Sequence, residues 1–255
     1  MGKIMRTPII AGNWKLNKTI SEAVELTKGL KDLVAATNNV EIVVAPPFTA
    51  LDAVSKVIED SNISLAAQDV YWEDSGAFTG EVSVPMLKDA GCDYIIVGHS
   101  ERRQFFNETN ENVNQKVNAV LSHNLKPIIC VGEQLVEREA GHTEIVIEDH
   151  VSGAVENLPS DAVLSCIIAY EPVWAIGTGK TATPKQAQEV HNYIRNLLKE
   201  TYSDEIASQI RIQYGGSVKP ENAAELMAQP DVDGALVGGA SLQAESFAQI
   251  VKSAM

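Results

Sequence analysis

The sequence lacks a long hydrophobic run. No apolar run in its 255 residues approaches the ~20 that a bilayer span needs, so we expect no membrane-spanning segment. Near the amino terminus, Lys3 and Arg6 are followed by neither an apolar segment nor a small-residue cleavage site before the polar Asn13. Hydrophobic residues make up 45% of the chain and charged residues 21%, which is typical of folded cytosolic proteins. We therefore expect a soluble protein that is not secreted.

Cysteine is scarce. The only three are Cys92, Cys130 and Cys166, and each lies in or beside an apolar run. An odd number of cysteines without metal-type spacing argues against a disulfide framework and against a metal site. We expect reduced thiols in a cytoplasmic protein, with no bound metal.

Positive charge is also in short supply. The chain has 20 Lys and Arg against 34 Asp and Glu, for a net charge of -14. Because the basic residues form no cluster, we expect no nucleic-acid partner. The overall field would repel an anionic substrate. A phosphate site would have to be built locally, from backbone N–H groups and one or two lysines.

The sequence does contain a recurring unit of a short apolar strand, a polar or glycine-containing loop and an amphipathic helix. We count eight candidate strands: Pro8 to Gly12, Glu41 to Ala45, Ile63 to Ala67, Tyr94 to Val97, Pro127 to Val131, Leu164 to Ala169, Ile210 to Tyr214 and Gly234 to Val237. Several are apolar without alternation, as in strands buried on both faces. Helical patterns between them are Ser21 to Val34, Ala50 to Ile58, Asn112 to Leu121, Glu144 to Val155 and Pro184 to Leu198.

The helix at Pro184 has a clear start, with Thr183 as N-cap and Gln186 placed to complete a capping box. The length fits one large barrel or two small domains. No linker or shift in composition marks a boundary, and strand and helix alternate throughout. The pattern predicts a single (β/α)8 barrel of eight parallel strands over residues 1–255, with a doubly wound open sheet as the alternative.

The most informative stretch is Ala169 to Lys180. Glu171 would end a buried strand, and Pro172 prevents continuation as a helix. Trp174 and Ile176 are large apolar residues in a loop that also carries glycines, which is the composition of a lid that packs over a ligand. The expected lid comprises Pro172, Val173, Trp174, Ala175, Ile176, Gly177, Thr178, Gly179 and Lys180.

Two further candidates follow the first and fourth strands, where barrel enzymes place their chemistry. Lys15 would point its ammonium into the mouth and stabilise a developing oxyanion; the alternative is a solvated surface lysine. His99 precedes a helix start, and the positive end of that helix would keep its imidazole neutral. A satisfied core or surface histidine is the alternative. Glu101 is either an electrostatic support or half of a local ion pair with Arg102.

The remaining strand ends carry a cysteine and two glycine pairs. Cys130 would lie within reach of Glu171, where we interpret it as a small apolar residue and not as a nucleophile. Gly215-Gly216-Ser217 and Gly238-Gly239-Ala240 follow the last two strands. Glycine pairs there allow a close backbone approach to an anion, so together they predict a phosphate site.

One βα loop is unusually long. Asp69 to Glu81 includes the aromatic residues Tyr71, Trp72 and Phe78. Long loops of this kind are functional or interfacial more often than idle. We favour an interface over a lid.

The chain resembles the triosephosphate isomerase family in five motifs that occur in the family's order. They are Ala11-Gly12-Asn13-Trp14-Lys15, Val97-Gly98-His99-Ser100-Glu101-Arg102-Arg103, Ala169-Tyr170-Glu171-Pro172-Val173-Trp174-Ala175-Ile176-Gly177-Thr178-Gly179-Lys180, Tyr214-Gly215-Gly216-Ser217 and Leu236-Val237-Gly238-Gly239-Ala240-Ser241. Leu16 replaces a frequent Met, and Lys219 a frequent Asn. Lys219 either adjusts phosphate affinity or points to solvent.

The resemblance implies interconversion of dihydroxyacetone phosphate and D-glyceraldehyde 3-phosphate, in glycolysis and gluconeogenesis, by a cytoplasmic homodimer without a cofactor. Glu171 would be the base, His99 would polarise the carbonyl and move protons between the oxygens, and Lys15 and Asn13 would stabilise the enediolate. Phosphate would bind Gly177, Ser217, Gly238 and Gly239. Ser100, Glu101 and Cys130 would support the site, and loop Asp69 to Glu81 would insert into the partner subunit. Another phosphate-binding barrel enzyme and a catalytically dead scaffold are the rival interpretations.

Overall fold

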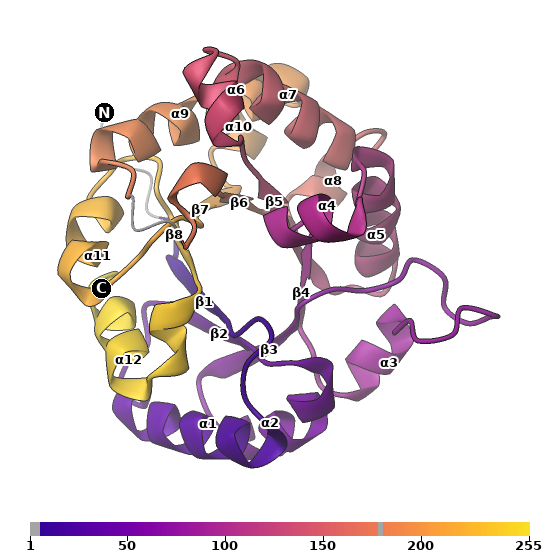
Figure 1. Ribbon diagram of the computed structural model, residues 1–255, viewed down its shortest axis with the longest axis vertical. Helices are drawn as coiled ribbons and strands as arrows, with labels where there is room; N and C mark the ends of the chain where they lie inside the picture. Colours follow the sequence, from indigo (N-terminus) through magenta and orange to yellow (C-terminus); the bar gives the residue numbers. More distant parts are fainter. Residues whose placement is uncertain (1–5, 178–180) are drawn as a thin grey trace.

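A closed barrel of eight parallel strands forms the centre of the molecule (Figure 1). The computed structural model describes residues 6–177 and 181–255. The strands are β1 (Ile9–Asn13), β2 (Glu41–Ala45), β3 (Ile63–Ala67), β4 (Tyr94–Val97), β5 (Lys126–Val131), β6 (Ile167–Tyr170), β7 (Arg211–Tyr214) and β8 (Gly234–Val237). Each pairs with the next, and β8 pairs back to β1. The predicted (β/α)8 barrel is therefore confirmed.

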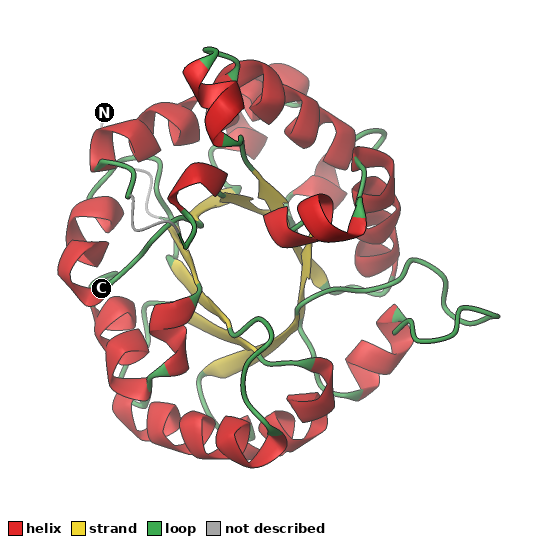
Figure 2. Cartoon of the chain, viewed as in Figure 1, coloured by secondary structure: helices red, strands yellow, loops and turns green. Residues whose placement is uncertain are grey.

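Helices surround the barrel on its outside (Figure 2). They are α1 (Ile20–Val34), α2 (Leu51–Ile58), α3 (Val84–Asp89), α4 (Ser100–Phe106), α5 (Asn110–Ser122), α6 (Leu135–Glu139), α7 (Thr143–Ala154), α8 (Ser160–Val163), α9 (Pro184–Thr201), α10 (Asp204–Ala207), α11 (Pro220–Met227) and α12 (Ala244–Lys252). Short 3-10 turns are η1 (Phe48–Ala50), η2 (Val173–Ala175) and η3 (Gly239–Leu242). Within the described ranges, no helix combines the length and the apolar character that crossing a membrane requires.

The predicted boundaries hold to within a few residues, with one clear error. The sixth strand begins at Ile167 and not at Leu164. The preceding residues form α8, Leu164 ends that helix and is 41% exposed, and the Cys166 N–H turns back to the Val163 carbonyl at 3.0 Å. The predicted capping box is present: the Thr183 hydroxyl accepts from the Gln186 N–H at 3.2 Å.

The strands are buried on both faces, which explains their continuous apolar sequences. Ile10 and Ile42 belong to a large cluster that includes side chains of the surrounding helices. The alternate residues Ile9 and Val43 belong to a second cluster built from strand residues alone. Because successive strand side chains point to opposite faces, this second cluster fills the barrel interior.

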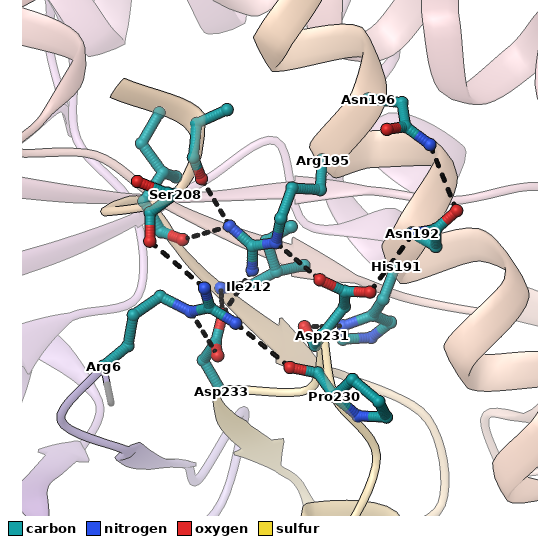
Figure 3. A network of polar contacts seen from close by, with 12 residues as sticks. Arg6, His191, Asn192, Arg195, Asn196, Ser208, Ile212, Pro230, Asp231 and Asp233 are labelled. Atoms are coloured by element: carbon teal, nitrogen blue, oxygen red, sulfur yellow. Dashed lines mark hydrogen bonds and ion pairs between the residues drawn. The ribbon is translucent and has the colours of Figure 1, made fainter. Parts of the chain in front are cut away.

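A buried polar network joins elements at the amino-terminal end of the barrel (Figure 3). On α9, Arg195 contacts Asp231 at 2.8 Å and Asp233 at 2.6 Å. Arg6, which precedes β1, donates to the other Asp233 oxygen at 2.6 Å. Asp233 also accepts the Ile212 N–H of β7 at 3.0 Å. These bonds satisfy the Asp233 carboxylate, which burial removes from water. They lie at the amino-terminal end of the barrel, where interactions contribute to stability and not to catalysis.

Candidate active site

The carboxyl ends of the strands surround a cavity of about 880 Å³. Its lining brings together residues that the sequence places far apart. Of the residues predicted for substrate or catalysis, Asn13, Lys15, His99, Glu171, Gly177, Ser217, Gly238 and Gly239 all line it. Ser100 and Cys130 line a smaller cavity of about 100 Å³, and Glu171 borders both cavities.

Glu171 follows β6 directly and is 2% exposed. One carboxylate oxygen lies 2.9 Å from Nε2 of His99, and the other accepts the Ser100 N–H at 3.0 Å. Gly215 packs against it so closely that a Cβ there would lie 2.9 Å from the Glu171 Cγ. The strand-seven glycine therefore has a steric role in addition to any contact with a ligand.

The surroundings of Glu171 act on its acidity in opposite directions. Burial raises the pKa of Glu171, whereas His99, the Ser100 N–H and the charge of Lys15 lower it. The net result is a pKa below the ordinary glutamate value. Glu171 is thus a carboxylate near neutral pH, which is the form that can accept a proton.

The imidazole of His99 is oriented by the start of α4. Its Nδ1 accepts the Glu101 N–H at 3.2 Å. Because Nδ1 is the acceptor, the neutral ring carries its proton on Nε2, and Nε2 faces Glu171. The geometry fits the neutral imidazole expected from the sequence, and the side chain is 6% exposed.

Lys15 adopts a left-handed backbone conformation, with φ at 53°. Its N–H donates to the Asn13 side chain at 3.0 Å, which fixes the turn after β1. The ammonium lies 2.6 Å from Glu101, and the Cε lies 3.6 Å from the position of a Cβ on Gly238. Lys15 therefore points across the mouth toward the strand-eight loop and is not a solvated surface lysine.

Glu101 pairs with Lys15, and the local ion pair with Arg102 that the sequence left open does not form. Arg102 instead contacts Asp69 at 2.8 Å. Asp69 also contacts the buried Lys116 of α5 at 2.7 Å. Burial raises the pKa of Asp69, and Lys116 opposes that effect. This cluster connects the start of the long loop to α4, the helix that begins directly after His99.

The loops after β7 and β8 both line the cavity. The Ser217 carbonyl accepts from the Asn222 side chain at 3.1 Å, and the Ser241 hydroxyl donates to the Gly238 carbonyl at 2.7 Å. A Cβ on Gly239 would meet nothing within 4 Å. The two loops are fixed by their own hydrogen bonds, while Gly239 faces open space that an anion can enter.

The start of the predicted lid contacts a buried carboxylate that the sequence did not single out. The indole N–H of Trp174 donates to Glu133 at 2.8 Å, and the Val173 N–H donates to the Glu133 carbonyl at 3.1 Å. Glu133 is 0% exposed and also accepts from the Tyr170 hydroxyl at 3.1 Å. Its position at the end of β5 was the available signal. Thr178, Gly179 and Lys180 lie outside the described residues.

The Cys130 thiol lies against the Glu171 carboxylate and is fully buried. Burial and the Glu171 charge raise the pKa of Cys130 well above the ordinary thiol value. A thiol that stays protonated is a poor nucleophile, in agreement with the sequence interpretation. Across residues 6–177 and 181–255, no three His, Cys, Asp or Glu side chains are grouped to hold a metal ion.

The loop from Asp69 to Glu81 projects away from the barrel beside α3 (Figure 1). Its aromatic rings pack on one another, with Tyr71 4.2 Å from Trp72 and 4.6 Å from Phe78 between ring centroids. Phe78 is 40% exposed, and Leu16, in the loop after β1, is 98% exposed. Apolar side chains thus remain uncovered on the long loop and in the loop after β1.

Comparison with known proteins identifies the family. The family model for triosephosphate isomerase matches residues 8–254. A triosephosphate isomerase of Moorella thermoacetica is 60% identical over 247 residues, which cover 97% of this chain and 98% of the relative. One of Pelobacter propionicus is 59% identical with the same coverage, and one of Alkaliphilus oremlandii is 55% identical over 97% of this chain and 99% of the relative. Since the match spans the barrel and every loop at its mouth, the chain belongs to the triosephosphate isomerase family.

Proposed function

We propose that Glu171, His99 and Lys15 carry out the triosephosphate isomerase reaction at the mouth of the barrel. The chain interconverts dihydroxyacetone phosphate and D-glyceraldehyde 3-phosphate through an enediolate, a step of glycolysis and gluconeogenesis. The observation that supports these roles is the meeting of an ionised, buried carboxylate, a neutral imidazole and an ammonium around one cavity. A scaffold without catalytic function would not need this arrangement.

Glu171 removes a proton from the carbon beside the carbonyl and returns it to the neighbouring carbon. Nε2 of His99, which faces Glu171 at 2.9 Å, donates its proton to the carbonyl oxygen and moves a proton between the two oxygens. Substrate binding therefore replaces the contact between the two side chains with contacts from each of them to the substrate. No cofactor takes part in this proposal.

Lys15 and Asn13 stabilise the negative charge of the enediolate. The phosphate is held by four backbone N–H groups, those of Gly177, Ser217, Gly238 and Gly239. Closure of the lid, residues 172–180, excludes water and prevents the enediolate from eliminating its phosphate. Support for the phosphate site comes from the two fixed glycine loops that face the cavity.

The active form in this proposal is a cytoplasmic homodimer, and the whole chain acts as one catalytic domain. Loop Asp69 to Glu81 inserts into the partner subunit. Exposed apolar side chains on this loop and at Leu16 support the interface. The link from Asp69 to Arg102 gives the loop a physical connection to the helix that presents His99 and Glu101.

A coupled assay tests the proposal. Purified protein is given D-glyceraldehyde 3-phosphate, and the dihydroxyacetone phosphate formed is detected by oxidation of NADH. We expect rapid turnover by the natural chain and loss of nearly all activity in Glu171→Gln, which retains the shape of the side chain without its charge. Folded protein that is inactive would favour a different phosphate-binding barrel enzyme or a binding scaffold.

A further inference from the structure

We propose that Lys219 is a substrate-binding residue that attracts the phosphate dianion into the cavity. The inference rests on the proposed function and adds to it a residue that acts on the phosphate by charge. It begins from the charges around the cavity. Apart from His99, the ionisable side chains that line it are Lys15, Glu101, Glu171, Lys219 and Glu221, so three carboxylates face two lysines.

The Lys15 ammonium is only partly available to the phosphate. It lies 2.6 Å from Glu101, and its proposed task is at the enediolate. Lys219 differs, because among the residues that the structure describes no carboxylate lies within ion-pair distance of its ammonium. Because the net charge of -14 repels an anion, a lysine without an ion-pair partner at the cavity should have a larger effect on substrate binding.

Lys219 is held close to the phosphate loop. Its N–H donates to the Asn222 side chain at 2.8 Å, and the same side chain donates to the Ser217 carbonyl at 3.1 Å. The segment from Ser217 to Lys219 is thereby fixed at the start of α11. Two residues span at most about 7 Å. A lysine side chain that lines the same cavity can place its charge within the Debye length of about 8 Å from a phosphate at Ser217.

The expected effect follows from Coulomb's law. A unit charge about 8 Å from a dianion in water changes affinity by about fivefold. Such an attraction acts equally on the bound substrate and on the transition state. It therefore raises kcat/KM and lowers KM, while kcat is unchanged.

The test compares Lys219→Asn with Lys219→Arg and with Lys252→Gln as a matched control. Lys252 is exposed at the carboxyl end of α12 and does not line the cavity. At low ionic strength we expect kcat/KM of Lys219→Asn to fall about three- to tenfold, with kcat unchanged. The inhibition constant of inorganic phosphate should rise by a similar factor, and added salt should reduce both effects.

The same experiment contains the outcomes that would overturn the inference. Lys219→Arg retains the charge and should resemble the natural enzyme, and all variants should isomerise unphosphorylated glyceraldehyde equally. If kcat/KM of Lys252→Gln fell as much as that of Lys219→Asn, the cause would be the net charge of the protein. If kcat of Lys219→Asn fell together with kcat/KM, the substitution would have disturbed the site itself. Unchanged kinetics in Lys219→Asn would also refute the role. Inactivity of the natural chain would instead contradict the proposed function.

Discussion

A carboxylate oxygen of Glu171 lies 2.9 Å from Nε2 of His99, so the proposed base and the proposed proton donor contact each other directly. The contact keeps the ring proton on Nε2, the atom that is proposed to donate it to the substrate. It also holds both side chains in one orientation while the Ser100 N–H restrains the second oxygen. A small displacement of either side chain should therefore cause a large loss of turnover.

Glu171→Asp should lower kcat by about 100-fold or more, with a much smaller change in KM. The shorter side chain retains the charge but withdraws the carboxylate by about 1 Å, and misplacement on that scale is sufficient for such a loss. Steady-state kinetics in both reaction directions would measure it. Turnover close to normal would remove Glu171 from the role of base.

A phosphorylated hydroxamate that mimics the enediolate should bind more tightly than substrate, because the site is complementary to the intermediate. When bound, it should protect the segment from Trp174 to Lys180 against proteolysis. The Trp174 indole donates to Glu133, so its fluorescence should change when the lid moves on binding. Inorganic sulfate at matched ionic strength provides the control. Cleavage at the same rate with and without the mimic would contradict the lid assignment.

Some parts of the site were predictable because parallel strands bring their carboxyl ends together. Lys15, His99 and Glu171 each lie one or two residues beyond a strand, so their meeting around one cavity followed from the fold. Glu133 also follows a strand, yet no local pattern indicates that its side chain turns inward to hold Trp174. That choice depends on the packing of two loops, which a single sequence does not encode locally.

The sixth strand was misplaced for a related reason. Leu164 to Ala169 is a short apolar run, and such a run does not reveal where a helix ends and a strand begins. Here α8 extends through the residue before Leu164, and Leu164 is the C-cap of that helix. The pairing of Asp69 with Arg102 was likewise missed, because it joins a loop to a helix that lies far along the chain.

Acid should destabilise the protein through His191. The ring is 0% exposed, and burial lowers the pKa of His191 from 6.5 to about 4. The unfolded chain binds this proton below pH 6.5 and the folded chain only below about pH 4, so stability is lost as pH falls through that window. At pH 5 the loss should be about 2 kcal/mol for this group.

Urea unfolding at pH 7 and at pH 5 would measure the effect. His191→Gln retains a donor for the Asp231 carbonyl, which the ring contacts at 3.1 Å. This variant should show a smaller difference between the two pH values. His142→Gln, at an exposed position, should behave as the natural protein does. An undiminished pH dependence in His191→Gln would show that other groups cause the acid sensitivity.

Deletion of Glu73 to Ala77 should convert the proposed dimer into a folded monomer with sharply reduced turnover. The shortened loop can no longer support Lys15 and His99 of a partner, whereas Glu171 and the phosphate loops remain in place. Analytical ultracentrifugation and activity measurements on the same dilution series would check it. A deletion variant that stays dimeric, or a fully active monomer, would contradict the assignment.

A milder substitution separates the loop from general surface hydrophobicity. Phe78→Ser removes an apolar side chain that is 40% exposed on the loop, and Val136→Ser removes one that is 67% exposed on α6. Only the first should weaken association. If both variants dissociate equally, or if neither does, the interface does not lie on this loop.

Closure of the barrel has a consequence for synthesis of the chain. Ile9 of β1 pairs with Gly234 of β8, and a Cβ on Gly234 would lie 1.9 Å from the Ile9 carbonyl oxygen, so this joint requires glycine. A ribosome adds about 5–20 residues per second. The first strand therefore waits on the order of ten seconds or more with one edge unpaired. During that interval the nascent chain presents an open β-edge with which a neighbouring chain can pair, so we expect the yield of folded enzyme to depend on how well that edge is shielded until Gly234 emerges.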